Sequence, residues 1–306
     1  MNFFLETLRV ILMCIYYLLE FFLSFIFARK KNIAGEIVLI TGAGSGIGRL
    51  MALKFARLGA VLVLWDVNLE GNKETARLAC KIGAARVHEY ICDCSKRQEV
   101  YQVADQVKKE VGDVSILINN AGIITGQMFL DTPDMLLEKS IQVNTMAHFW
   151  TVKAFLPAMV ASNHGHVVTI SSAAGFNGVN KMADYCTSKF AVLGFAESLA
   201  SEMLAMKKNG IKSTIVCPYL VNTGMFDGCE TKWPCLLPII NPEYAAERIV
   251  SGILRNERYI LMPRVLYFCN VMKSILPAKM VDVLYDYFGV LQVMNRFKGR
   301  TKMTED

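Results

Sequence analysis

The chain has 306 residues, of which 53% are hydrophobic, and it carries a formal net charge of +6 at neutral pH. This length suffices for one large domain or two small ones, and so high an apolar content suggests contact with a membrane. Because no dense Lys/Arg block is interleaved with aromatic residues, we do not expect a nucleic-acid-binding protein. The nine cysteines include no Cys-x-x-Cys pair, which indicates a reducing compartment without a disulfide framework, and we expect no bound metal.

The first element in chain order is an apolar segment over Val10–Ala28, interrupted by Glu20 and followed by three basic residues at 29–31. As a helix, its 19 residues would span about 28 Å, just enough to cross a bilayer. We predict that residues 1–31 form a membrane anchor and that the basic flank keeps the rest of the chain on the cytosolic face. Since Glu20 is unfavourable at mid-depth, a shallow hairpin or an interfacial helix stays open, and a buried helix of a soluble protein is the alternative.

From Glu36 onward, strand-like apolar runs alternate with helical stretches. The predicted strands are Ile37–Thr41, Val61–Trp65, Val87–Cys92, Val114–Asn119, Val167–Ser171, Lys212–Cys217 and Tyr259–Met262. The predicted helices include Gly46–Leu58, Lys96–Val111, Pro133–Val160, Tyr185–Met206 and Pro242–Arg255. Continuous apolar strands alternating with helices are typical of a parallel sheet covered on both faces. The predicted fold class is therefore α/β, with a single doubly wound domain of the Rossmann type over residues 32–262.

The C-terminal extension, residues 263–306, begins with an apolar stretch over Pro263–Phe297 that contains scattered basic residues. This pattern predicts a pair of amphipathic helices that covers the substrate site or lies on a membrane. Ordinary packing against the core is the alternative.

A glycine-rich sequence at 41–48 follows the first predicted strand and opens the first helix of the domain. In this context, Gly42 permits a tight turn, Gly46 lets the backbone approach a pyrophosphate and Gly48 permits close packing. The free N–H groups at the start of the helix also attract phosphate. The sequence therefore predicts a dinucleotide site whose contacts in this loop are Gly42, Ser45, Gly46, Ile47 and Gly48.

Two acidic residues follow neighbouring strands of the predicted sheet. Asp66 ends the second strand, 18 residues past Gly48, where a carboxylate accepts hydrogen bonds from both ribose hydroxyls of NAD. The same charge repels a 2′-phosphate, and position 45 is a serine, so we predict NAD rather than NADP and alcohol oxidation as the direction. Asp93, after the third strand, is placed to bond the adenine amino group, although a plain loop aspartate is the alternative.

The candidate catalytic residues are a tyrosine and a lysine four positions apart, Tyr185 and Lys189, which share one face of a helix. A nearby ammonium favours the phenolate, and lowering a tyrosine pKa from about 10 to about 7 requires about 4 kcal/mol. The phenolate then accepts the proton of an alcohol while hydride leaves for the nicotinamide. Ser172, 13 residues before Tyr185, ends a strand and is placed to hold the substrate oxygen.

Further residues complete a pattern. Asn119, Ala121 and Gly122 follow the fourth strand, and Asn144 lies within the next helix. With the glycine loop and the catalytic residues in this order, residues 35 to about 262 resemble the short-chain dehydrogenase/reductase family. The resemblance implies the strand order 3-2-1-4-5-6-7.

The resemblance also implies roles for single residues. Tyr185 would be the proton acceptor, Lys189 would bind the nicotinamide ribose, Ser172 would bind the substrate and Asn144 would hold a relay water. Asn119, Ala121 and Gly122 would line the adenosine side and brace the sheet, and Pro218, Val221 and Thr223 would lie by the nicotinamide. A homodimer through the Pro133–Val160 and Tyr185–Met206 helices is implied as well. Tyr219 replaces the glycine that usually follows Pro218 in the family, so we expect a different local turn.

Within the family, the anchor and the runs at 35–44, 63–66, 116–122 and 224–226 resemble the retinol dehydrogenases, in a branch that includes 17-beta-hydroxysteroid dehydrogenases. This implies an enzyme of the endoplasmic reticulum or lipid droplets that acts on a lipophilic alcohol, and we predict oxidation of all-trans-retinol with NAD. The segment after Thr223 is expected to form an apolar lid from Met225, Phe226, Trp233, Leu236, Leu237, Ile239 and Ile240. Core packing of this segment is the alternative.

The sequence is also compatible with other functions. Within enzymes, the alternatives are a 17-beta-hydroxysteroid dehydrogenase and a long-chain fatty alcohol dehydrogenase, because apolar pockets discriminate weakly among lipids. From another class, the alternative is a lipid-droplet scaffold protein without turnover, although all of its catalytic residues are present.

Overall fold

The computed structural model describes residues 3–27 and 30–299, with side chains described at 3–20 and 30–299. It divides into two compact units, Met1–Asn32 and Ile33–Asp306. The described part of the first unit contains the helix α1 (Phe3–Phe27), whose described side chains are apolar except for a few polar and charged residues. Among the residues described, we find no helix that is both long and apolar enough to cross a membrane. The predicted span, Val10–Ala28, continues beyond the side chains that are described, so it is not confirmed.

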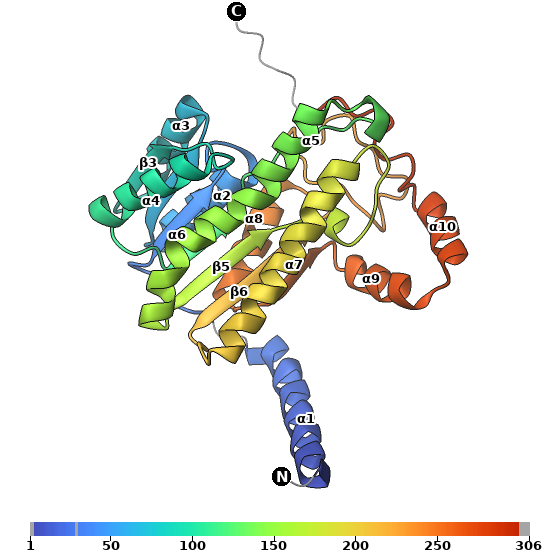
Figure 1. Cartoon of the computed structure of the whole chain (residues 1–306), viewed down its shortest axis with the longest axis horizontal. Coiled ribbons are helices and arrows are strands. Elements are labelled where there is room, and N and C mark those ends of the chain that lie inside the picture. Colours follow the sequence, from blue (N-terminus) through green and yellow to red (C-terminus); the bar gives the residue numbers. More distant parts are fainter. Residues whose placement is uncertain (1–2, 28–29, 300–306) are drawn as a thin grey trace, which may run out of the picture. The chain divides into compact units, whose positions relative to one another are not determined.

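The second unit is built on a seven-stranded parallel sheet in the order β3-β2-β1-β4-β5-β6-β7, as predicted (Figure 1). The strands are β1 (Ile37–Thr41), β2 (Val61–Asp66), β3 (Val87–Ile91), β4 (Ile116–Asn119), β5 (Gly165–Ile170), β6 (Ile211–Pro218) and β7 (Tyr259–Met262). Their direction brings all the carboxyl ends to one edge of the sheet. The order reverses between β1 and β4, and ligands bind at such a switch point in doubly wound folds.

Side chains of the central strands alternate between two apolar cores because successive strand residues point to opposite faces. Val38 and Ile40 of β1 belong to one core and Leu39 to the other. The first core is closed by α2 (Gly46–Arg57), α3 (Leu69–Lys81) and α8 (Pro242–Leu254). The second is closed by α4 (Arg97–Glu110), α6 (Ala147–Ser162) and α7 (Ala183–Ala205). Both faces of the sheet are thus covered, which explains why its inner strands are apolar throughout.

The predicted Pro133–Val160 helix is found as one continuous helical run, but it is not a regular α-helix throughout. The structure divides it into α5 (Asp134–Ile141), a π-helical turn at Gln142–Met146 and α6. Such turns hold one extra residue and occur frequently at functional sites. Helix α3 has few apolar residues, and its clearest sequence signal is Asn68, whose side chain caps the helix by accepting from the Gly71 N–H at 2.9 Å.

The C-terminal extension contains two helices, α9 (Val265–Ile275) and α10 (Ala278–Tyr287). After them, Val293 and Met294 are buried in a small apolar cluster that includes Met182 and Tyr185 of the catalytic region. This extension therefore helps to support the residues of the site.

Candidate active site

A cleft of about 590 Å³ lies along the carboxyl edge of the sheet. Of the residues predicted for the site, 15 line this cleft and two, Asn119 and Asn144, do not. The predicted residues in the lining are Gly42, Ser45, Gly46, Ile47, Gly48, Asp66, Asp93, Ala121, Gly122, Ser172, Tyr185, Lys189, Pro218, Val221 and Thr223. The sequence pattern thus converges on one site.

The glycine loop between β1 and α2 leaves no room for side chains at two positions. Gly42 has a φ of +66°, and a Cβ there would lie 2.9 Å from the Cα of Ala121. A Cβ on Gly48 would lie 2.1 Å from the carbonyl oxygen of Gly42. The loop is therefore folded tightly onto the start of α2, whose first residues line the cleft, and the N-terminus of a helix suits a pyrophosphate.

The Asp66 carboxylate, at the end of β2, organises the next part of the cleft. One oxygen accepts from the Gly44 N–H and the other from the Asn68 N–H, each at 2.8 Å. A carboxylate oxygen has further lone pairs, so both remain able to accept from ribose hydroxyls. Arg49 lies nearby, but its guanidinium donates to Gly44 O, Gly71 O and Thr75 Oγ1 and does not line the cleft. These residues fit NAD better than a dinucleotide with a 2′-phosphate.

Tyr185, Lys189 and Ser172 meet at the other end of the cleft. Lys189 Nζ donates to Ile170 O at 3.0 Å and lies 5.5 Å from the centre of the Tyr185 ring. Burial lowers the pKa of Lys189 to about 8, so its ammonium predominates at neutral pH. Burial raises the pKa of Tyr185, and a hydrogen bond with Ser172 opposes that rise, so the lowered pKa that the sequence predicts for this phenol is not found in the structure. The hydroxyl, the ammonium and the second hydroxyl thus form one proton-transfer centre.

Asn144 lies beneath this centre, inside the π-helical turn. Its Oδ1 accepts from Ile123 N at 2.8 Å, and its Nδ2 donates to Ile123 O at 2.9 Å and to Ser188 Oγ at 3.0 Å. The side chain therefore ties the segment after β4 to α7, one residue before Lys189. Its predicted part in holding a relay water stays a prediction.

Comparisons with known proteins agree with this geometry. The family model described as short chain dehydrogenase matches residues 36–232. The chain belongs to the short-chain dehydrogenase family.

Individual relatives cover most of the chain. It is 65% identical to epidermal retinol dehydrogenase 2 of Mus musculus over 90% of this chain and 89% of that protein. It is 53% identical to short-chain dehydrogenase/reductase family 16C member 6 of Bos taurus over 100% of this chain and 97% of that protein. A short-chain dehydrogenase/reductase from Burkholderia phymatum, solved in complex with NAD, superposes with a TM-score of 0.72 at 25% identity, covering 83% of this chain and 96% of that one. The predicted family is confirmed, and the chain is a nicotinamide-dependent oxidoreductase.

The two roles predicted for Asn119 in this short-chain dehydrogenase are divided between Asn119 and its neighbour Asn120. Asn119 is buried, and its Oδ1 accepts from Thr151 Oγ1 at 2.7 Å, so it braces α6 against β4 and does not line the cleft. The next residue, Asn120, lines the cleft, and its Nδ2 donates to Thr41 O at 2.9 Å and to Gly42 O at 3.2 Å. Two adjacent asparagines after a strand indicate that one of them could face the cleft, but the sequence does not show which one.

The predicted lid is correct only in part. Met225 and Phe226 line the cleft of this dehydrogenase, and the Phe226 ring meets the Tyr185 ring edge-on at 6.0 Å between centroids. Trp233, Leu236 and Ile239 are exposed outside the cleft, whereas Leu237 and Ile240 are buried in the cores. None of these five lines the cleft: two pack in the cores, the alternative that the sequence left open, and three face the solvent.

Tyr219 also lines the cleft and packs partly buried against three apolar clusters. Among the described residues, those other than glycine with positive φ are Asn163, Lys181, Lys207 and Asn256, and Tyr219 is not one of them. The turn after β6 therefore needs no glycine here, and the tyrosine adds an aromatic wall to the substrate end.

Proposed function

We propose that this short-chain dehydrogenase oxidises a lipophilic alcohol with NAD, and that the alcohol is all-trans-retinol. The observation that carries the proposal is the meeting of Tyr185, Lys189 and Ser172 in a cleft whose other end is organised by Asp66. The name of the 65% identical relative, epidermal retinol dehydrogenase 2, supports retinol as the substrate.

The residues of the chain supply binding and proton transfer. NAD, when bound, supplies the acceptor for the hydride. Ser172 Oγ donates to the substrate oxygen and holds it near Tyr185, and the Tyr185 phenolate accepts the hydroxyl proton. Lys189 stabilises that phenolate with its buried ammonium, and it contacts the nicotinamide ribose in the proposed complex. Gly42, Ser45, Gly46, Ile47 and Gly48 hold the pyrophosphate, Asp66 the adenosine ribose, and Pro218, Val221 and Thr223 border the nicotinamide.

The substrate end supports an apolar alcohol because three apolar or aromatic residues, Tyr219, Met225 and Phe226, form its wall. None of these three described wall residues carries a charge. A long polyene buries well against such a wall, at about 25 cal/mol per Å² of apolar surface removed from water.

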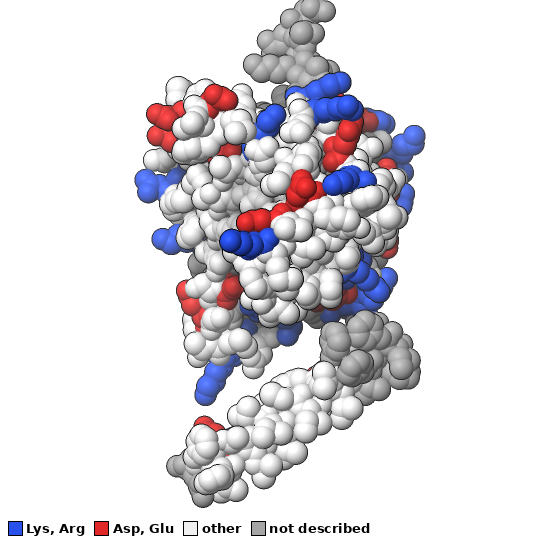
Figure 2. Space-filling view, turned by 90° about the vertical axis from the view of Figure 1, so that its right-hand side faces the viewer, with Lys and Arg blue, Asp and Glu red and all other residues white. Residues whose placement is uncertain are grey.

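Membrane contact is supported by the C-terminal extension. Phe268, Val271 and Ile275 form an exposed apolar stripe on α9 at helical spacing, and Met280, Val283 and Tyr287 form a second on α10. Uncharged surface predominates on the side of the molecule where these helices lie (Figure 2). We propose that both stripes rest on a cytosol-facing membrane or lipid-droplet surface, with residues 1–31 as an anchor, so that the substrate enters from lipid.

A cofactor-by-substrate matrix on membranes tests the reaction. Microsomes containing the full chain are incubated with NAD or NADP and with retinol, estradiol or a long-chain alcohol. We expect retinaldehyde from retinol with NAD at a rate well above that with NADP. Equal rates with the two dinucleotides contradict the role of Asp66, and faster turnover of estradiol or of the long-chain alcohol contradicts retinol as the substrate.

The membrane proposal has a separate test. Phe268→Glu combined with Ile275→Glu should lower the oxidation of retinol delivered in phosphatidylcholine vesicles and leave the oxidation of a short, water-soluble alcohol unchanged. Leu204→Glu, at an exposed leucine of α7, is the matched control. A pair of changes that leaves retinol oxidation at the control rate contradicts membrane contact through these stripes.

A further inference from the structure

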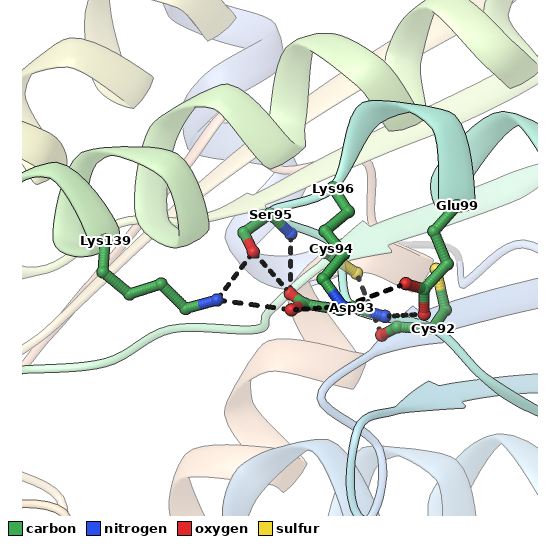
Figure 3. Close-up of polar contacts among 7 residues, drawn as sticks. All are labelled: Cys92, Asp93, Cys94, Ser95, Lys96, Glu99 and Lys139. Atoms are coloured by element: carbon green, nitrogen blue, oxygen red, sulfur yellow. Dashed lines mark hydrogen bonds and ion pairs between the residues drawn. The ribbon is translucent and has the colours of Figure 1, made fainter.

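An ion-pair network crosses one end of the cleft and joins two segments that are far apart in sequence (Figure 3). Lys139 projects from α5 toward the loop after β3, where its Nζ donates to Ser95 Oγ at 2.7 Å and lies 3.3 Å from Asp93 Oδ2. Ser95 in turn donates to Asp93 Oδ1 from its hydroxyl at 2.6 Å and from its backbone N–H at 3.0 Å. Both oxygens of the Asp93 carboxylate are therefore held in place.

Neighbouring residues strengthen this arrangement. Lys96 Nζ lies 3.7 Å from Asp93 Oδ2, and the Asp93 N–H donates to Glu99 Oε1 at 2.7 Å. Burial alone would raise the pKa of Asp93, but the bonds from Ser95 and the ammonium of Lys139 outweigh it and the pKa is lowered. Asp93 is thus an ionised group that only accepts hydrogen bonds at neutral pH.

The position of the network points to the base of the dinucleotide. Asp93 and Lys139 line the same cleft as Asp66, together with Cys92 and Cys94 on either side of Asp93. Since Asp66 is the acceptor for the adenosine ribose in the proposed function, the cleft beyond it is where the adenine lies. The Asp93 side chain is 19% exposed and that of Lys139 is 43% exposed, so the network is open to a ligand.

We propose that Lys139 is a positioning residue for cofactor specificity, which fixes the Asp93 carboxylate so that it accepts the adenine amino group. An acceptor fixed at this place favours a purine with an amino group at C6 and repels one with a carbonyl oxygen there. The proposal rests on the proposed function in one respect, that a nicotinamide dinucleotide enters this cleft.

The test uses Lys139→Met in the full chain and measures the dissociation constants of NADH and of reduced nicotinamide hypoxanthine dinucleotide by calorimetry. The two dinucleotides differ at C6 of the purine. We expect Lys139→Met to weaken NADH about tenfold, in line with the loss of one charge-assisted contact, and to reduce the preference for NADH over the hypoxanthine form. The turnover number at saturating NAD should not change, because Lys139 touches no reacting atom.

Two further variants separate positioning from general damage. Lys139→Arg keeps the charge and should retain most of the preference, whereas Lys153→Met, at an exposed lysine of α6 outside the cleft lining, should bind both dinucleotides as the wild type does. Binding by Lys139→Met within twofold of wild type overturns the proposal, as does an equal loss for both dinucleotides. Failure of the wild-type protein to bind either dinucleotide would instead overturn the proposed function.

Discussion

The two ends of the cleft are built differently. The cofactor end consists of backbone groups and short polar contacts, such as Asp66 with Gly44 and Asn68, and it leaves no space for a Cβ at Gly42 or Gly48. The substrate end consists of larger apolar side chains, among them Tyr219 and Phe226, from a segment without regular secondary structure. The first end demands particular residues at particular spacings, whereas the second demands only apolar residues of suitable volume.

This difference explains why the sequence predicts the cofactor more sharply than the substrate. A misplaced donor or acceptor at the cofactor end loses a hydrogen bond to a charged group, about 1.5–3 kcal/mol. An apolar exchange at the substrate end changes discrimination by only about 1–3 kcal/mol for each methylene-sized difference. A short sequence motif therefore indicates the class of cofactor, whereas the identity of the substrate depends on several apolar side chains together.

The largest effect is expected at Tyr185, where the two ends meet. Tyr185→Phe removes the proton acceptor and should lower the turnover number about 10³- to 10⁴-fold with every alcohol, because general base catalysis typically contributes 10²- to 10⁴-fold. Steady-state rates on membranes measure this, and NADH binding should be unchanged. Turnover that survives the change would assign the proton transfer to another residue, and a cellular effect that survives it would favour a scaffold role.

A smaller effect is expected from a change confined to the cofactor end. Asp66→Ala removes the acceptor for the ribose hydroxyls and should lower kcat/KM for NAD about 30- to 100-fold, which corresponds to about 2–3 kcal/mol. The value for NADP should fall less or rise, since the repulsion of a 2′-phosphate is gone. The ratio of the two values is the measurement, and an unchanged ratio would contradict the assignment of Asp66.

A buried histidine, His148, offers a test by pH. Burial lowers the pKa of His148 to about 3 from 6.5, and the charge of Lys189 adds to this. The unfolded chain therefore binds more protons between these values, so the free energy of unfolding is highest above pH 6.5 and falls as the pH falls, by about 1.4 kcal/mol per unit from this residue. Urea unfolding in detergent at pH 6.5 and 5.5 should show a smaller decrease for His148→Gln. An identical decrease in both proteins would contradict the burial of a neutral imidazole.

The smallest effect is expected at the substrate end alone. Phe226→Ala removes the ring that meets Tyr185 edge-on and should lower kcat/KM for retinol about tenfold, within the range of an apolar pocket contact. A short alcohol that does not reach this wall should be little affected, and KM for NAD should stay constant. A loss that is equal for both alcohols would indicate that Phe226 supports Tyr185 rather than the substrate.

Much of the fold follows from periodicity, and less of the site does. The β1 and β7 limits are predicted to the residue, because each strand is a short apolar run that follows a charged residue and ends before a glycine or a proline. The π-helical turn between α5 and α6 is not predictable from periodicity, since Asn144 gains its place through contacts with Ile123 and Ser188 that lie far away in sequence. Lys139 is missed for the same reason. Its partners, Asp93 and Ser95, are more than 40 residues away, and a surface lysine on a helix gives no signal by itself.

The π-helical turn at Gln142–Met146 has a consequence for the stability of this enzyme. One residue in an α-helix corresponds to a rotation of about 100°, so the additional residue sets the angle between the side chains of α5, such as Lys139, and those of α6, which pack on the sheet. Deleting that residue would yield a continuous helix with better backbone hydrogen bonds, yet it would rotate Asn144 away from both of its partners. Backbone hydrogen bonding and the position of Asn144 therefore place opposite demands on this one turn.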